Sequence, residues 1–266
     1  MSSRKTAVAG QFYPSNPSEI EAMFSQYNKI IDESLHGDTE ILNLKTRAII
    51  VPHAGYVYSG FTANIAFRLL ADSKIKRIVV IGPSHRVSFK GISIGEYDNY
   101  DTPLGTLPID KNLVSELKNK FGLVFIPEVH CEHSTEVQMP FIKTYLPNAS
   151  VVELVYGDEN PSNLSEVIQY LLKDVTTAVV ISTDLSHFYD IDKANTLDTI
   201  CIEAIKKLDV NRLSLGCEAC GKIGIEAMLI SAKKNCLRPM VLDYRTSADA
   251  SEDKSQVVGY MSAVFL

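Results

Sequence analysis

Polar side chains follow three short apolar runs of the sequence. His53, His85 and His187 each come just after a run rich in β-branched residues. Asp184 lies between the last run and His187. A neutral imidazole is the commonest metal ligand in proteins, and a histidine beside a carboxylate can also transfer protons. One such histidine is more often structural, but three at equivalent positions favour a shared metal site.

A second polar cluster reads HCEHS and covers residues 130–134. It contains Glu132 and His133 and precedes a helical pattern. A histidine that binds a metal usually has its other ring nitrogen held by a carboxylate or a carbonyl. Glu132 or Asp184 could supply that carboxylate. The alternative for Asp184 is a helix N-cap.

Cys217 and Cys220 form a CxxC motif. Alone, this motif suggests a redox-active dithiol or half of a zinc site. The sequence has no second CxxC, and the motif lies between helical patterns rather than after an early strand. A thiolate at the start of a helix is stabilised by the helix dipole, so Cys220 is expected to be a metal ligand. The remaining cysteines are expected to be packing residues: Cys131, Cys201, Cys217 and Cys236.

Other catalytic templates fit the sequence poorly. The segment 82–86 reads GPSHR and lacks the second glycine of a GxSxG nucleophile elbow. No GxxxxGK[ST] motif is present, and no GxGxxG motif follows a strand. These observations argue against a serine hydrolase, a phosphate-loop NTPase and a dinucleotide-dependent enzyme.

Strand and helix patterns alternate along the chain. Continuously apolar runs, typical of strands covered on both faces, occupy residues 46–52, 76–82, 149–157, 176–183, 240–246 and 256–266. Helical apolar spacing occurs at residues 61–73, 134–146, 163–174, 194–208 and 222–235. This alternation predicts an α/β fold with a largely parallel central sheet flanked by helices. Ligands bind such sheets beyond the carboxyl ends of the strands, where the histidines lie.

The rest of the chain offers few boundaries. Residues 91–110 predict a hairpin or edge strands, and the polar stretch 32–40 predicts a surface loop. No linker or repeat divides the sequence, so we expect residues 1–266 to form a single domain.

Composition limits the partners and the compartment. The 266 residues carry a net charge of −6 and no basic run, so neither nucleic acid nor an anionic membrane is an expected partner. No apolar run approaches the length of a membrane span, and the first residues do not form a signal peptide, which predicts a cytoplasmic protein. Five sparse cysteines suit a reducing compartment and argue against a disulfide framework.

Several motifs together resemble the Memo family, whose microbial members are also called AmmeMemoRadiSam system protein B. The resemblance is collinear from near residue 7 to the C-terminus. Its motifs are AGQFYP (9–14), PHAGYVYSG (52–60), GPSH (82–85), EHSTEVQMPF (132–141), DLSHF (184–188), the CG pair (220–221) and YRTSADASEDKSQVVGY (244–260).

The resemblance implies a fold and a set of site residues. Memo proteins resemble class III extradiol dioxygenases, which hold non-haem Fe(II) with two histidines and a carboxylate. By matching motifs, His53 and His85 take the two histidine positions, and Cys220 replaces the carboxylate. His187 with Asp184 takes the place near the acid/base histidine.

The resemblance also implies a function. It indicates a metal-binding protein with iron, or alternatively copper, and a redox role, with Glu132 and His133 lining the pocket. Ring cleavage of catechols is not expected, because the carboxylate ligand is missing. The alternative is a non-enzymatic partner or scaffold in a pathway with AMMECR and radical-SAM proteins, in which the pocket is vestigial.

Overall fold

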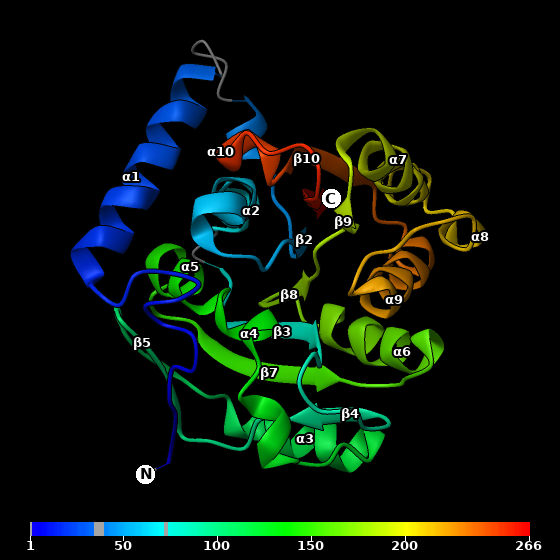
Figure 1. Cartoon of the computed structure of the whole chain (residues 1–266). Helices are drawn as coiled ribbons and strands as arrows, with labels where there is room; N and C mark the ends of the chain where they lie inside the picture. Colours follow the sequence, from blue (N-terminus) through cyan, green and yellow to red (C-terminus); the bar gives the residue numbers. More distant parts are fainter. Residues whose placement is uncertain (1, 35–39, 72–73) are drawn as a thin grey trace.

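The computed structural model describes residues 2–34, 40–71 and 74–266 and shows a mixed α/β fold (Figure 1). Its main sheet has the strand order β10-β11-β2-β8-β3-β7-β4, and β9 pairs with β11. The bounds of these strands are β2 (Ala48–Val51), β3 (Arg77–Pro83), β4 (Ile92–Ile94), β7 (Ser150–Tyr156), β8 (Thr177–Ser182), β9 (His187–Tyr189), β10 (Pro239–Thr246) and β11 (Val257–Phe265).

The four central strands β2, β8, β3 and β7 are parallel, which confirms the sequence prediction for the middle of the sheet. Ile181 of β8 lies between Ile50 of β2 and Ile81 of β3. The carboxyl ends of these strands therefore meet at one edge of the sheet. The loops that follow β2, β3 and β8 leave from that shared edge.

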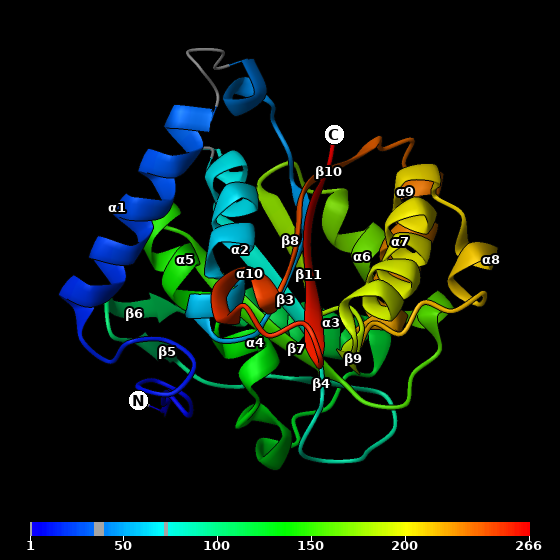
Figure 2. The ribbon, with the colours of Figure 1, turned by 45° about the horizontal axis from the view of Figure 1, so that its top comes forward.

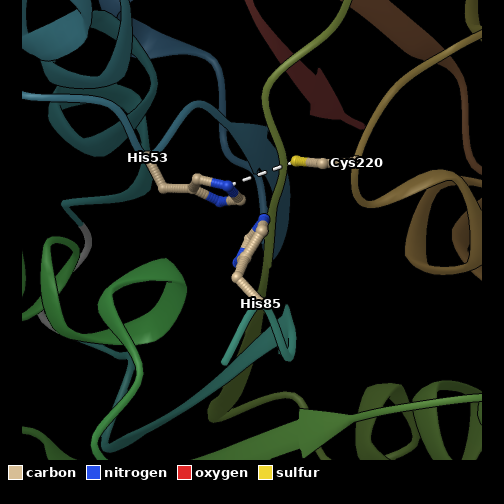
Figure 3. Close-up of side chains that lie close together, drawn as sticks. All are labelled: His53, His85 and Cys220. Atoms are coloured by element: carbon tan, nitrogen blue, oxygen red, sulfur yellow. Dashed lines mark hydrogen bonds between the residues drawn. The ribbon is translucent and has the colours of Figure 1, made fainter. Parts of the chain in front are cut away.

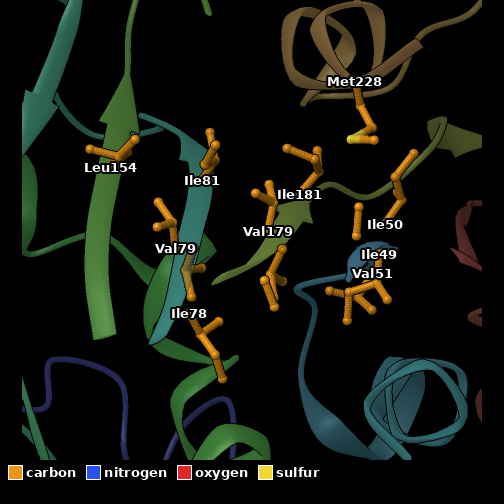
Figure 4. Close-up of a cluster of buried hydrophobic side chains, with 14 of the residues drawn as sticks. Ile49, Ile50, Val51, Ile78, Val79, Ile81, Leu154, Val179, Ile181 and Met228 are labelled. Carbon is orange, nitrogen blue, oxygen red and sulfur yellow. The ribbon is translucent and has the colours of Figure 1, made fainter. Parts of the chain in front are cut away.

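The continuously apolar runs form the middle of the hydrophobic core (Figure 4). Helices cover both faces of the parallel strands, so side chains on both faces are removed from water. The side chains labelled in the figure have no exposed surface: Ile49, Ile50, Val51, Ile78, Val79, Ile81, Leu154, Val179, Ile181 and Met228.

The outer strands run antiparallel to their neighbours. β10 pairs with β11, β11 pairs with β2, and β4 pairs with β7, all antiparallel. The last segment of the chain, residues 239–265, thus returns to the sheet as a hairpin-like pair with β11 beside β2. The largely parallel arrangement is confined to the central strands.

Helices pack on both faces of the sheet (Figures 1 and 2). On one face, α2 contacts β2 and β11, and α1 and α5 lie beside it. On the other face, α6 and α9 contact β8. α7 contacts β10 and β11. The helices are α1 (Pro17–Ser34), α2 (Tyr56–Leu70), α3 (Lys111–Phe121), α4 (His133–Glu136), α5 (Met139–Tyr145), α6 (Pro161–Leu172), α7 (Ile191–Lys207), α8 (Val210–Leu213), α9 (Lys222–Lys234) and α10 (Ala248–Ser251), with 3₁₀ turns at Glu40–Asn43 and Pro127–His130.

Two expected helices differ in their bounds. The helix predicted at 61–73 begins earlier, at Tyr56, and ends at Leu70. The pattern at 134–146 is divided into α4 and α5, because Pro140 has no N–H for a continuous helix and starts a new one. Most of the loop predicted at 32–40 lies outside the described residues.

A smaller sheet completes the fold. β5 (Asn99–Thr102) and β6 (Gly105–Pro108) form the predicted hairpin, and β1 (Ser3–Arg4) adds in parallel to β5. Helices α1 and α3 were not among the helices predicted from the sequence. None of the helices in the described part of the chain has the length and apolar character needed to cross a bilayer.

Candidate metal centre

The structure brings His53, His85 and Cys220 together at the carboxyl edge of the parallel strands (Figure 3). His53 follows β2 and His85 follows β3, and their ring centroids are 5.1 Å apart. Cys220 arrives from the loop before α9, and its Sγ atom lies 3.2 Å from His53 Nε2. One ligand atom from each residue lies within 4.8 Å of the other two. Metal–ligand bonds of about 2.0–2.3 Å would bring such atoms to one ion with little movement.

His53 is buried, with 1% of its surface exposed. Burial lowers its pKa well below the ordinary value, and neighbouring His85 and His133 lower it further. Its Nδ1 atom lies 3.0 Å from the hydroxyl oxygen of Ser182, the last residue of β8. His53 is therefore a neutral imidazole with one ring nitrogen engaged inside the protein.

Glu132 connects His85 to His133. Its Oε1 atom lies 3.2 Å from His85 Nδ1 and 2.8 Å from His133 Nδ1, and the peptide N–H of His85 donates to Oε2 at 2.7 Å. Burial raises the pKa of Glu132, but the hydrogen bonds from His133 and His85 outweigh it and hold that pKa well below its ordinary value. Glu132, His85 and His133 also form a second group with metal-ligand spacing. The peptide hydrogen bonds to the carboxylate favour an orienting role for Glu132.

Asp184 links His53 to Cys220. Its Oδ1 atom accepts a hydrogen bond of 2.7 Å from the His53 peptide N–H. Its own peptide N–H donates to Cys220 Sγ at 3.3 Å, and its carbonyl accepts from the Cys220 peptide N–H at 3.3 Å. Burial raises the pKa of Asp184, and the His53 hydrogen bond opposes that rise. A strand rather than a helix follows Asp184, so the residue is not a helix N-cap.

His187 begins β9, where it pairs with Val258 of β11. The loop before it is held by Asp198 of α7, whose Oδ1 accepts a hydrogen bond of 2.9 Å from the Ser186 peptide N–H. Asp198 also packs tightly on Gly259, where an added Cβ would meet Oδ2 at 1.9 Å. His187 is half-buried beside the site and lies outside the group with metal-ligand spacing.

The environment of Cys220 favours the protonated thiol rather than the thiolate that its place before a helix predicts. Burial and the nearby Asp184 carboxylate raise its pKa to about 12. At neutral pH without a metal, the pair therefore consists of a thiol and a neutral imidazole. A metal ion that binds the sulfur must displace the thiol proton.

The other cysteines correct the sequence expectation. Cys217 forms a disulfide with Cys201 of α7 rather than acting as an unpaired packing residue. Cys131 and Cys236 are exposed rather than packed in the core. The paired cysteines are 16 positions apart in the sequence, and the CxxC motif gives no indication of this pairing. Cys220 is left as a free, half-buried thiol.

Two groups of site residues were missed from the sequence. Ser182 and Gln138 contact each other beside His53, with Gln138 Nε2 2.9 Å from Ser182 Oγ. The rings of Phe12 and His133 are tilted against each other with centroids 4.7 Å apart, which brings the N-terminal segment to the pocket wall. Ser182 could have been noticed as a polar residue that ends an apolar strand. Phe12 has no local signal, because its contact depends on how the N-terminal segment crosses the molecule.

The fold and the His/His/Cys group define a mixed α/β protein with a polar site at the carboxyl edge of its parallel strands. Residues 4–264 match the family model described as Memo-like protein. A MEMO1 family protein of Thermoplasma volcanium is 34% identical, with 98% of this chain and 97% of the relative aligned. A MEMO1 family protein of Aquifex aeolicus is 32% identical, with 99% of each chain aligned. The chain belongs to the Memo family.

Proposed function

We propose that the chain binds a redox-active transition metal, iron or alternatively copper, through His53, His85 and Cys220. The convergence of their three ligand atoms within 4.8 Å carries this proposal. These residues come from three separate loops, so local sequence proximity does not account for their meeting.

The donor set suits such a metal. Two imidazoles and one thiolate are softer than two imidazoles and a carboxylate, and they favour copper or iron over hard cations such as Mg²⁺. A bound iron or copper ion would supply one-electron redox chemistry. His85 is exposed while His53 is buried, so the group is open to solvent on the His85 side.

The surrounding residues would hold the ligands and move protons. Glu132 holds His85 from its Nδ1 side, which leaves Nε2 for a metal. The peptide N–H of Asp184 directs a hydrogen bond to Cys220 Sγ and would stabilise the thiolate. We assign proton transfer to His187 and Asp184, and a lining role in the pocket to Glu132 and His133.

The likeness of Memo proteins to class III extradiol dioxygenases suggests the same fold for this chain. The activity does not follow, because Cys220 stands where those enzymes have a carboxylate ligand. We expect no ring cleavage of catechols. Oxygen consumption by the Fe(II)-loaded protein with a catechol would contradict this expectation.

A second proposal comes from the family resemblance alone. In it, the chain is a cytoplasmic partner or scaffold for AMMECR and radical-SAM proteins, and the pocket is vestigial. Co-purification with such proteins, combined with no metal binding by the isolated chain, would favour this alternative.

The test of the metal proposal is an anaerobic titration of the reduced, metal-free protein with Fe(II) and with Cu(I), followed by elemental analysis. We expect one equivalent of metal per chain. The His53→Ala/His85→Ala double variant should lose that equivalent. Cys236→Ser is the matched control, because Cys236 is an exposed thiol and should not affect binding. Unchanged binding in the double variant would contradict the proposed site.

A further inference from the structure

A chain of hydrogen bonds reaches His53 from inside the protein. It consists of Gln138, Ser182 and the Nδ1 atom of His53, all buried. An atom that can only accept, such as a carbonyl oxygen, requires its partner to donate, and this fixes the hydrogen positions along such a chain. Two backbone carbonyl oxygens that contact the chain, one at Gln138 and one at Ser182, determine which atom donates in each of its hydrogen bonds.

The first carbonyl fixes the side-chain amide of Gln138. Gln138 Nε2 lies 2.8 Å from the carbonyl oxygen of Pro52, which can only accept. The NH₂ group must therefore occupy the position facing Pro52. The same NH₂ group lies 2.9 Å from Ser182 Oγ, so Gln138 donates a hydrogen bond to the serine hydroxyl.

The second carbonyl fixes the hydroxyl of Ser182. The Ser182 hydroxyl makes a short hydrogen bond to the carbonyl oxygen of Ser134, and only the hydroxyl can donate in that contact. A serine hydroxyl has a single proton, which this contact uses. Ser182 can then only accept from Gln138 and from His53 Nδ1.

From this geometry we infer that Ser182 and Gln138 are positioning residues that hold His53 in the tautomer with its proton on Nδ1. The lone pair on Nε2 then faces Cys220, on the side where a metal would bind. The consequence for metal affinity rests on the function proposed above, whereas the tautomer does not.

The two histidines are thus held by different partners. Glu132 is a carboxylate and makes the His85 imidazole a stronger electron donor, whereas Ser182 is neutral. Among the described residues, the one carboxylate hydrogen-bonded to His53, that of Asp184, accepts from the peptide N–H rather than from Nδ1 of the ring. The peptide N–H groups of His85 and His133 donate to the buried Glu132 carboxylate and offset its burial.

The tautomer can be read directly by long-range proton–nitrogen NMR of the metal-free full chain labelled with ¹⁵N-histidine at neutral pH. Loss of one signal set in His53→Gln assigns His53. We expect the pattern of a neutral ring with its proton on Nδ1. A proton on Nε2, or a doubly protonated ring, would overturn the inference. This measurement on the unaltered protein does not depend on any variant folding.

Variants of Ser182 test the positioning role. Ser182→Ala should lose the Nδ1–H pattern and weaken metal binding about tenfold or more, as loss of an orienting partner does. Ser182→Thr keeps the hydroxyl and should restore both. Ser262→Ala is the matched control, because Ser262 is a buried strand serine whose hydroxyl has no hydrogen-bond partner among the described residues. An unchanged tautomer in Ser182→Ala would overturn the role of Ser182.

The outcomes separate the two proposals. An Nδ1–H tautomer in a protein that binds no metal would leave this inference standing and remove the proposed function. An Nε2–H tautomer in a protein that binds metal through His53 would overturn this inference and leave the proposed function standing.

Discussion

His53 Nε2 lies 3.2 Å from Cys220 Sγ, although 167 positions separate the two residues in the sequence. Ser182 and Gln138 leave no proton on Nε2, so the thiol of Cys220 is the donor in this contact. Without a metal, the site is therefore closed by a thiol–imidazole hydrogen bond. A metal ion would replace the shared proton.

Metal binding should therefore release a proton from Cys220. Its pKa of about 12 keeps the thiol protonated through the neutral range, and only the thiolate binds a metal. Affinity should rise as pH rises from 6 to 8, by about tenfold per pH unit for one released proton. Calorimetry in buffers of different ionisation enthalpy counts the released protons. In Cys220→Ser the count should fall by one, and an equal count in both proteins would contradict the prediction.

Cys217→Ser and Cys220→Ser should fail in different ways. Cys217→Ser opens the disulfide to Cys201 and should cost about 3 kcal/mol in the free energy of unfolding, since the paired residues are 16 positions apart. Its metal affinity should stay close to that of the unaltered protein. Cys220→Ser should weaken metal binding about tenfold or more and keep the disulfide.

Denaturant unfolding and competition against a chelator, both without added thiol, measure these two effects. Cys201→Ser serves as the control and should match Cys217→Ser in both assays. Equal losses of affinity in Cys217→Ser and Cys220→Ser would support a dithiol instead.

Glu132 should make the protein acid-sensitive. Its pKa in the folded chain is well below the ordinary 4.5, so its stabilising contribution is present above pH 4.5 and is lost as pH falls below it. Glu132→Gln should destabilise the chain at pH 7 by about 1–3 kcal/mol, because buried donors lose a charged acceptor. The difference between the two proteins should shrink between pH 5 and pH 3. Urea unfolding across this range tests the prediction, and a constant difference would contradict it.

Glu136 should anchor the N-terminal segment that carries Phe12. Its buried carboxylate pairs with Arg4 and accepts hydrogen bonds from the peptide N–H of Ala7 and the hydroxyl of Tyr13. Glu136→Gln leaves the buried guanidinium without its partner and should cost about 3 kcal/mol or more in the free energy of unfolding.

The exposed ion pair between Lys5 and Asp101 provides a control in the same segment. Asp101→Asn should cost less than about 1 kcal/mol, because water screens exposed pairs. A similar small loss in Glu136→Gln would show that the segment is not anchored in this way.

Local sequence patterns predicted the centre of the fold well. Continuously apolar runs gave the parallel strands, and positions after those runs placed His53 and His85 at one edge. Their role as metal ligands stays a prediction. Helices α1 and α3 do carry local sequence signals: Pro17 begins α1, and α3 lies between the N-cap Asp110 and the left-handed Gly122.

Other features depend on contacts between distant segments and had no local signal. The Cys201–Cys217 disulfide requires α7 to pack beside the loop that leads to α9. The hydrogen bonds of Ser182 require α4 and the start of α5 to meet the end of β8. The antiparallel pairing of β10 with β11 and of β11 with β2 likewise follows from how the C-terminal strands return to the sheet, since the composition of a strand does not encode its direction.

X-ray absorption of the protein loaded anaerobically with one equivalent of iron or copper tests the central claim most directly. We predict one sulfur and at least two imidazole nitrogens around the metal. The sulfur signal should persist in Cys217→Ser and disappear in Cys220→Ser. A metal without a sulfur ligand in the unaltered protein, or a sulfur signal that survives in Cys220→Ser, would contradict the assignment of His53, His85 and Cys220.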